Sequence, residues 1–121
     1  MGTRQMAHLD REIERLTGRV GQIQGDLREA ERKLERARLA RAAEEHDMRP
    51  GDLVEHRLHP EVRAIVDRYA TSDFGRGPVT LGVRRFNRDG RMSRRLDGGY
   101  APTMWRLVRR GAAALDDDGR L

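Results

Sequence analysis

The chain has 121 residues, of which 36% are hydrophobic and 37% are charged, so few apolar side chains are available for a core. It contains no cysteine, which excludes disulfides, thiolate zinc sites and a thiol nucleophile. No apolar run approaches the ~18 residues that a membrane span needs, and the N-terminus lacks the apolar segment of a signal peptide. We therefore expect no membrane contact and a cytoplasmic location, or assembly into a virion if a phage encodes the chain.

The net charge of +5 is unevenly distributed. Residues 1–48 carry ten basic and ten acidic side chains, whereas residues 49–121 carry fifteen basic and ten acidic ones. Between Arg76 and Arg110 there are ten arginines and only two acidic residues. Residues 76–110 are therefore expected to bind nucleic acid or an acidic protein surface.

A heptad repeat occupies the N-terminal third of the chain. Apolar residues recur in alternating steps of three and four, at Met6, Leu9, Ile13, Leu16, Val20, Ile23, Leu27, Ala30, Leu34 and Ala37. A stripe of two positions in seven is narrower than the core-facing side of a globular helix and is typical of a coiled-coil seam. We expect self-association, or binding of a partner helix, through residues 6–37.

The helix that carries this seam is expected to start near Thr3 and to end near Glu45. Pro50 and Gly51 follow, and proline disfavours helix in the residue before it. Because the seam stops at Ala37, residues 38–50 are expected to form a solvated helical extension and linker.

The charges beside the seam bear on helix orientation. A parallel in-register dimer brings like charges together in two places, Asp26 with Glu31 and Lys33 with Arg38. An antiparallel pair centred near residues 21 and 22 gives two attractive pairs and one repulsive pair: Glu12 with Lys33, Arg19 with Asp26, and Asp10 with Glu31. Exposed pairs contribute a few tenths of a kcal/mol each. The balance favours the antiparallel pair, with parallel trimers and another protein's helix as alternatives.

After Gly51 the pattern becomes that of short strands. Strands are expected at residues 52–56, 62–70, 79–86 and 91–96, and a strand or 3₁₀ turn at 105–108. Turn residues separate them, at 58–60, 71–78, 87–90 and 98–102. The expected fold class is α+β: a coiled-coil helix over residues 1–48, a small antiparallel barrel over 49–110 and a flexible tail over 111–121.

Three segments resemble SH3-like barrels of the Tudor and KOW kind. They are the opening Pro50-Gly51-Asp52-Leu53-Val54, the strand 79–86 with its Asp89-Gly90 hairpin, and the closing Trp105-Arg-Leu-Val108. The resemblance covers about residues 50–110. It implies a domain that binds peptides, modified side chains, RNA, DNA or RNA polymerase, or that serves only as structure. No site residue carries over from it.

Arginines supply the main candidate site. One predicted hairpin carries Arg84, Arg85, Arg88, Arg91, Arg94 and Arg95, and the last strand adds Arg106, Arg109 and Arg110 across the barrel. Clustered guanidinium groups bind phosphates in a bidentate manner, which favours nucleic acid. Carboxylates of an acidic protein satisfy the same groups, so both partners stay open.

The remaining candidates are weaker. Tyr69, Phe86, Tyr100 and Trp105 are interpreted mainly as core residues, and Phe74 as an exposed anchor. His56 and His59, with Glu55 and Glu61 nearby, are interpreted as a surface turn rather than a metal site. The serines, Ser72 and Ser93, stand in no nucleophile motif. We expect no cofactor, no metal and no enzymatic activity.

Two functions fit these patterns. The first is a non-enzymatic oligomeric binding protein that uses the coiled coil for self-association and the arginines for nucleic acid or another polyanionic surface. The second is a structural assembly protein, such as a minor capsid or decoration component. Heavy use of Arg, Ala, Gly and Asp with one Lys is typical of a GC-rich genome, which favours an actinobacterial phage for the second function.

Overall fold

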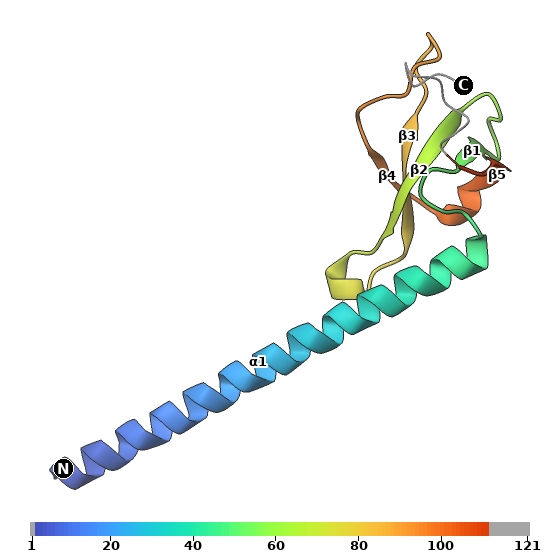
Figure 1. Ribbon diagram of the computed structural model, residues 1–121. Helices are drawn as coiled ribbons and strands as arrows, with labels where there is room; N and C mark the ends of the chain where they lie inside the picture. The colour runs from blue at the N-terminus through green and yellow to red at the C-terminus, as the bar shows by residue number, and fades with distance from the viewer. Residues whose placement is uncertain (1, 112–121) are drawn as a thin grey trace.

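The computed structural model describes residues 2–111 and shows one long helix followed by an antiparallel sheet (Figure 1). The expected α+β class is confirmed. The expected tail lies outside the described residues from residue 112 onward. The elements in chain order are α1 (Thr3–His46), β1 (Leu53–His56), β2 (Arg63–Ala70), the 3₁₀ turn η1 (Asp73–Gly75), β3 (Thr80–Arg85), β4 (Asp97–Tyr100), the 3₁₀ turn η2 (Pro102–Met104) and β5 (Trp105–Arg109).

Helix α1 has 44 residues and is therefore about 66 Å long. It ends where Asp47 adopts a left-handed conformation, with φ of 52°, and donates its N–H to the carbonyl of Ala43. The predicted bounds of the helix are confirmed to within one residue. Figure 1 shows that the C-terminal part of α1 lies against the sheet, while its N-terminal part extends away from it. Within residues 2–111, no helix is both long enough and apolar enough to cross a membrane.

The five strands form one sheet in the order β4-β3-β2-β1-β5, with every pair antiparallel. Successive strands pair from β1 to β4, and β5 returns to pair with β1 on its free side. Strands β1, β2, β3 and β5 occupy the stretches predicted for them. We call residues 49–111 the sheet domain. Its closure into a barrel stays a prediction.

The fourth strand differs from the prediction. Residues 91–96 were expected to form it, but within residues 2–111 their pairing is limited to an isolated bridge between Phe86 and Met92 and the hydrogen bonds beside it. The ladder resumes at β4, where a glycine turn was expected. The hairpin continues as far as the hydrogen bond from the Ser93 N–H to the Arg85 carbonyl, and the chain then turns where the Ser93 hydroxyl accepts the N–H of Arg95. The two glycines of β4 are tolerated because β4 is an edge strand that pairs through its backbone.

The core lies between the sheet and the end of α1. Its largest fully buried side chains are Trp105, Leu81, Val54 and Val83. Helix α1 and the segment after it add Ala42 and Met48, which are 6% and 2% exposed, with Leu39 and Ala43 packed against them. The expectation that residues 38–50 form a solvated linker is therefore wrong. These residues lie outside the heptad stripe, on a second face of the helix that packs on the sheet domain.

Candidate binding surfaces

The seam of α1 is exposed along its whole length. Its large side chains are between 40% and 60% exposed, and they are Met6, Leu9, Ile13, Leu16, Val20, Ile23, Leu27 and Leu34. Contiguous apolar surface of this extent on a soluble chain marks an interaction site. The sheet domain does not cover it, so the seam is available to a partner.

The sheet domain holds α1 beside the seam rather than on it. The Arg38 guanidinium donates to the carbonyls of Gly75 and Gly77, and Arg76 forms an ion pair of 2.8 Å with Glu31. Gly75, with φ of 91°, lies so close to α1 that an added Cβ would stand 2.9 Å from the backbone nitrogen of Glu35. Only glycine fits this contact, which fixes the η1 loop on residues 31–38 of the helix.

The η1 loop presents an aromatic ring next to the seam. Phe74 is 69% exposed, and Asp73 and Phe74 both adopt left-handed backbone conformations, with φ of 50° and 54°. Such conformations are unfavourable for residues other than glycine and are retained where the surroundings hold them. Shallow grooves lie between this ring and α1, and their lining includes Leu27, Arg28 and Glu31. The exposure predicted for Phe74 is confirmed.

Four of the candidate arginines have carboxylate partners in the sheet domain. Arg84 lies 3.7 Å from Asp67, and Arg85 lies 2.9 Å from Asp97 with its guanidinium 5.1 Å from the centre of the Tyr100 ring. On the other edge of the sheet, Arg106 pairs with Glu55 and Arg110 pairs with Asp47 and Asp52. These pairs join neighbouring strands or the two ends of the domain. Their arginines are therefore already neutralised within the fold.

The other hairpin arginines have no carboxylate partner among residues 2–111. They are exposed and lie in the connection between β3 and β4; we call them the arginine tip, which consists of Arg88, Arg91, Arg94 and Arg95. The nearby Asp89 carboxylate accepts the backbone N–H of Arg91 and so shapes the turn. Because η1 contacts α1 at the opposite ends of β2 and β3, the tip lies at the end of the sheet away from the helix (Figure 1).

Arg109 is separate from the arginine tip. It is exposed near the end of β5, which forms the edge of the sheet opposite β4. Its backbone is level with Leu53 of β1. The arginines of β5 thus do not join the hairpin arginines in a single set of ion pairs, and the arginine tip is the largest group of predicted site residues that form no ion pair within residues 2–111.

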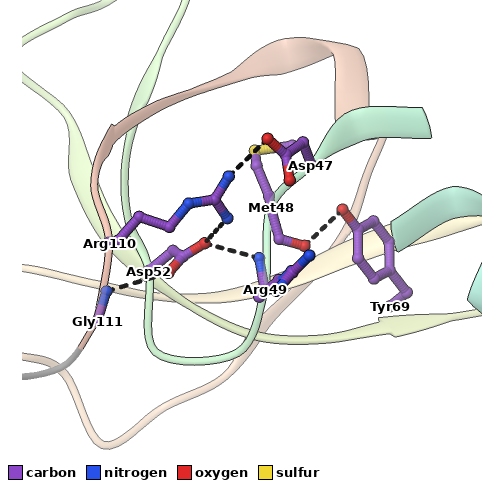
Figure 2. Close-up of polar contacts among 7 residues, drawn as sticks. All are labelled: Asp47, Met48, Arg49, Asp52, Tyr69, Arg110 and Gly111. Carbon is purple, nitrogen blue, oxygen red and sulfur yellow. Dashed lines mark hydrogen bonds and ion pairs between the residues drawn. The ribbon is translucent and has the colours of Figure 1, made fainter. Parts of the chain in front are cut away.

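A buried carboxylate joins α1, β1 and the end of β5 (Figure 2). Asp52 is 3% exposed and accepts the backbone N–H groups of Arg49 and Gly111 at 2.9 and 3.1 Å, as well as the guanidinium of Arg110 at 3.1 Å. We call these residues the Asp52 cluster. All three donors lie within the fold, so this carboxylate is structural rather than available to a ligand.

Tyr69 stabilises the same region, where the end of α1 meets the sheet domain. Its hydroxyl donates to the carbonyl of Met48 at 2.8 Å (Figure 2). Its ring stacks on His46, with 6.5 Å between the ring centres. Burial, together with the negative charges of Asp47 and Asp52, raises the pKa of Tyr69 above its usual value of 10.0.

The histidine prediction is only partly right. His59 is exposed, as expected for a surface turn, but His56 is 8% exposed. Its Nδ1 accepts the N–H of Leu58, and its ring meets Trp105 edge to face at 5.4 Å. His56 therefore belongs to the core. Within the described part of the chain, His, Asp and Glu side chains form no group of three or more that could hold a metal ion.

Comparison of the chain with protein-family models, with curated proteins and with solved structures gives no match. The function is therefore argued from the residues themselves.

Proposed function

We propose that the protein is a non-enzymatic, oligomeric binding protein that self-associates through α1 and binds nucleic acid through the arginine tip. The observation that carries this proposal is the contrast among the arginines. Arg84, Arg85, Arg106 and Arg110 pair with carboxylates, whereas the four of the arginine tip are exposed and form no ion pair within residues 2–111. Exposed guanidinium groups on a flat turn bind phosphates and release counterions.

Self-association supports the same function. Several weak phosphate contacts from one tip give modest affinity, and two tips on one assembly raise the effective concentration of the second after the first has bound. The free N-terminal part of α1 supplies the surface for such an assembly, because its apolar stripe is exposed.

The test removes the arginine tip and compares it with an equal loss of charge elsewhere. The variant Arg88/Arg91/Arg94/Arg95→Ala is compared with Arg4/Arg11/Arg32/Arg36→Ala, whose four arginines are exposed on outward positions of α1. Binding to fluorescent duplex DNA, single-stranded DNA and RNA is measured by anisotropy at about 50 and about 200 mM salt.

The tip variant is expected to bind about 100-fold more weakly, with a salt slope reduced by up to about 3 to 4 units. The helix variant is expected to stay within about threefold of the parent chain. An equal loss in both variants would show that net charge alone is responsible. Unchanged binding by the tip variant would contradict the assigned site.

A second candidate function is structural assembly, in which α1 packs against neighbouring proteins of a particle. The observation that favours it is an apolar surface, formed by the seam and Phe74, which is suited to contact with protein rather than with phosphate. Protein purified without nuclease distinguishes the two by its ratio of absorbance at 260 and 280 nm and its mass from light scattering. Co-purifying nucleic acid supports the first function, and a nucleic-acid-free assembly with no binding in the titrations supports the second.

A further inference from the structure

The seam has a centre of symmetry in the sequence. It lies between residues 21 and 22, and a second copy placed antiparallel about it pairs every seam position with another one. Each pair forms one layer of the coiled coil and occurs twice by symmetry. The five pairs are Met6 with Ala37, Leu9 with Leu34, Ile13 with Ala30, Leu16 with Leu27, and Val20 with Ile23. Each seam alanine then faces a large side chain, which is how layers interdigitate. In a parallel in-register pair, each alanine would face its own copy and leave two thin layers.

The ion pair between Arg76 and Glu31 removes the main objection to this arrangement. On charge alone, the antiparallel pair suffered from a contact between Asp10 of one copy and Glu31 of the other. In the structure Glu31 is 13% exposed and is bound by Arg76 at 2.8 Å, while Arg76 itself stays 48% exposed. Asp10 of a second copy would therefore approach an arginine as well as a carboxylate. The repulsive contact becomes neutral or attractive.

The same ion pair also relieves the contact between Asp26 and Glu31 in the parallel pair, but the second like-charge contact of that arrangement has no such compensation. There Lys33 would meet Arg38, whose guanidinium binds the carbonyls of Gly75 and Gly77 and has no carboxylate partner among residues 2–111. The carbonyls accept hydrogen bonds but supply no net negative charge. The like-charge contact between Lys33 and Arg38 therefore persists in the parallel arrangement, whereas no uncompensated like-charge contact remains in the antiparallel one.

The groove beside Phe74 is in the right place for an antiparallel partner. It borders the seam at Leu27 and extends along Gln24 and Glu31 to the ring. In the antiparallel pair, the residues opposite 24–31 of one copy are 12–19 of the other. That segment carries Ile13 and Leu16, which are exposed in the single chain. The exposed ring, held outward by a left-handed backbone, thus gains an apolar neighbour only when a second copy is present.

We propose that α1 pairs with α1 of a second copy in antiparallel orientation, with its centre between residues 21 and 22, and that residues 12–19 of each copy cover the Phe74 groove of the other. This proposal rests on the self-association in the proposed function and specifies its geometry. The two sheet domains then lie at opposite ends of a shared rod about 74 Å long. The arginine tips contact separate sites on a polyanion instead of neighbouring phosphates.

Disulfide trapping tests the orientation, because the chain has no cysteine of its own. The variants Leu9→Cys and Leu34→Cys are prepared separately, one with a tag that changes its size on a gel. In the antiparallel pair each of these positions lies about 37 Å from its own copy, since 25 residues of helix separate them. Each variant alone is expected to give no disulfide, and their mixture is expected to give the mixed disulfide after mild oxidation. Arg11→Cys, on an outward position, serves as the control and is expected to give none.

The alternative results each overturn the proposal in a distinguishable way. Disulfides from Leu9→Cys alone would show a parallel pair and leave the proposed self-association intact. A dimer by light scattering that gives none of these disulfides would exclude the stated register. A monomer at all concentrations would remove both the orientation and the oligomeric premise of the proposed function, whereas binding by the arginine tip is measured independently.

A second variant tests the Phe74 groove. Phe74→Gly removes the ring and relieves the left-handed backbone, so the single chain is expected to fold at least as well as before. The dissociation constant of the dimer is expected to rise about tenfold, measured by sedimentation or fluorescence dilution. Leu58→Ser is the control, because Leu58 is 70% exposed on a turn of the sheet domain. If Phe74→Gly leaves the dissociation constant at the control value, the groove is not part of the interface.

Discussion

The two parts of α1 use apolar residues in opposite ways. Residues 3–30 expose a stripe of large aliphatic side chains, whereas residues 31–46 bury small ones, chiefly Ala42 and Ala43, against the sheet domain. The two faces are rotated by about 100° from each other on the helix, at about 100° per residue. One continuous helix therefore presents a seam for one partner and a docking face for another, and the side-chain size on each face decides which contact it makes.

A charge placed on the docking face of α1 should prevent this face from packing on the sheet domain. Ala42→Asp buries a carboxylate among Tyr69, Val79 and the surrounding core, and an uncompensated buried charge costs about 3–5 kcal/mol. Ala40→Asp places the same charge on an exposed position of the same turn and is expected to change stability by less than about 0.5 kcal/mol. Chemical denaturation followed by Trp105 fluorescence measures both. Equal effects would show that the end of α1 is not packed on the core.

The contact between η1 and α1 should depend on the absence of a side chain at Gly75. Gly75→Ala combines left-handed strain with a Cβ 2.9 Å from the Glu35 backbone, and is expected to destabilise by about 2–4 kcal/mol. Gly90→Ala shares the positive φ, at 84°, but meets no atom within 4 Å. It is expected to lose only about 1 kcal/mol. If the two variants have the same melting temperature, backbone strain rather than contact with α1 accounts for the loss of stability.

Tyr69 should make the junction sensitive to high pH. Its folded pKa is raised, so the unfolded chain loses this proton first, near pH 10, while the folded chain keeps it. The free energy of unfolding is therefore unaffected below about pH 10 and falls as the pH rises from there through the folded pKa. Tyr69→Phe is expected to cost about 1–2 kcal/mol at neutral pH and to lack the fall due to this group. Denaturation series at several pH values compare the two chains.

The smallest effect is expected in the free part of α1. Gly21 faces outward with nothing within 4 Å of an added Cβ, so Gly21→Ala is expected to stabilise the helix by about 1 kcal/mol without altering contacts. Circular dichroism during thermal unfolding measures the gain. No change in the docked part of the molecule is expected, and a loss of helix would show that this glycine has a contact in the assembled protein.

The elements that depend on local patterns could be predicted from the sequence. The helix follows from heptad spacing, and the burial of Leu81 and Val83 follows from their alternation along β3. The position of β4 could not be predicted, because residues 91–96 have strand-like composition but leave the hairpin after Ser93, whose hydroxyl accepts the N–H of Arg95. Local bonds of that kind leave no periodic signal.

Which arginines form ion pairs and which do not could not be predicted from the sequence either. Arg85 pairs with Asp97 and Arg106 with Glu55 only because the strand register brings these residues together. The sequence does not distinguish one arginine from another, because the strand register decides which of them lie beside a carboxylate. The docking face of α1 was missed for a similar reason: alanines 42 and 43 are poor signals of burial until the sheet domain lies against them.

The Asp52 cluster has a mechanical consequence. The chain enters the sheet domain at Arg49 and leaves it at Gly111, and the Asp52 carboxylate binds both backbones. Because β1 and β5 are antiparallel neighbours, tension between these two points would pull the strands apart from one end, one bond at a time. The buried carboxylate closes that end. A load passed between the helix and whatever follows residue 111 would therefore act on the Asp52 carboxylate, and on the ion pair between Asp47 and Arg110, before it reached any strand of the sheet.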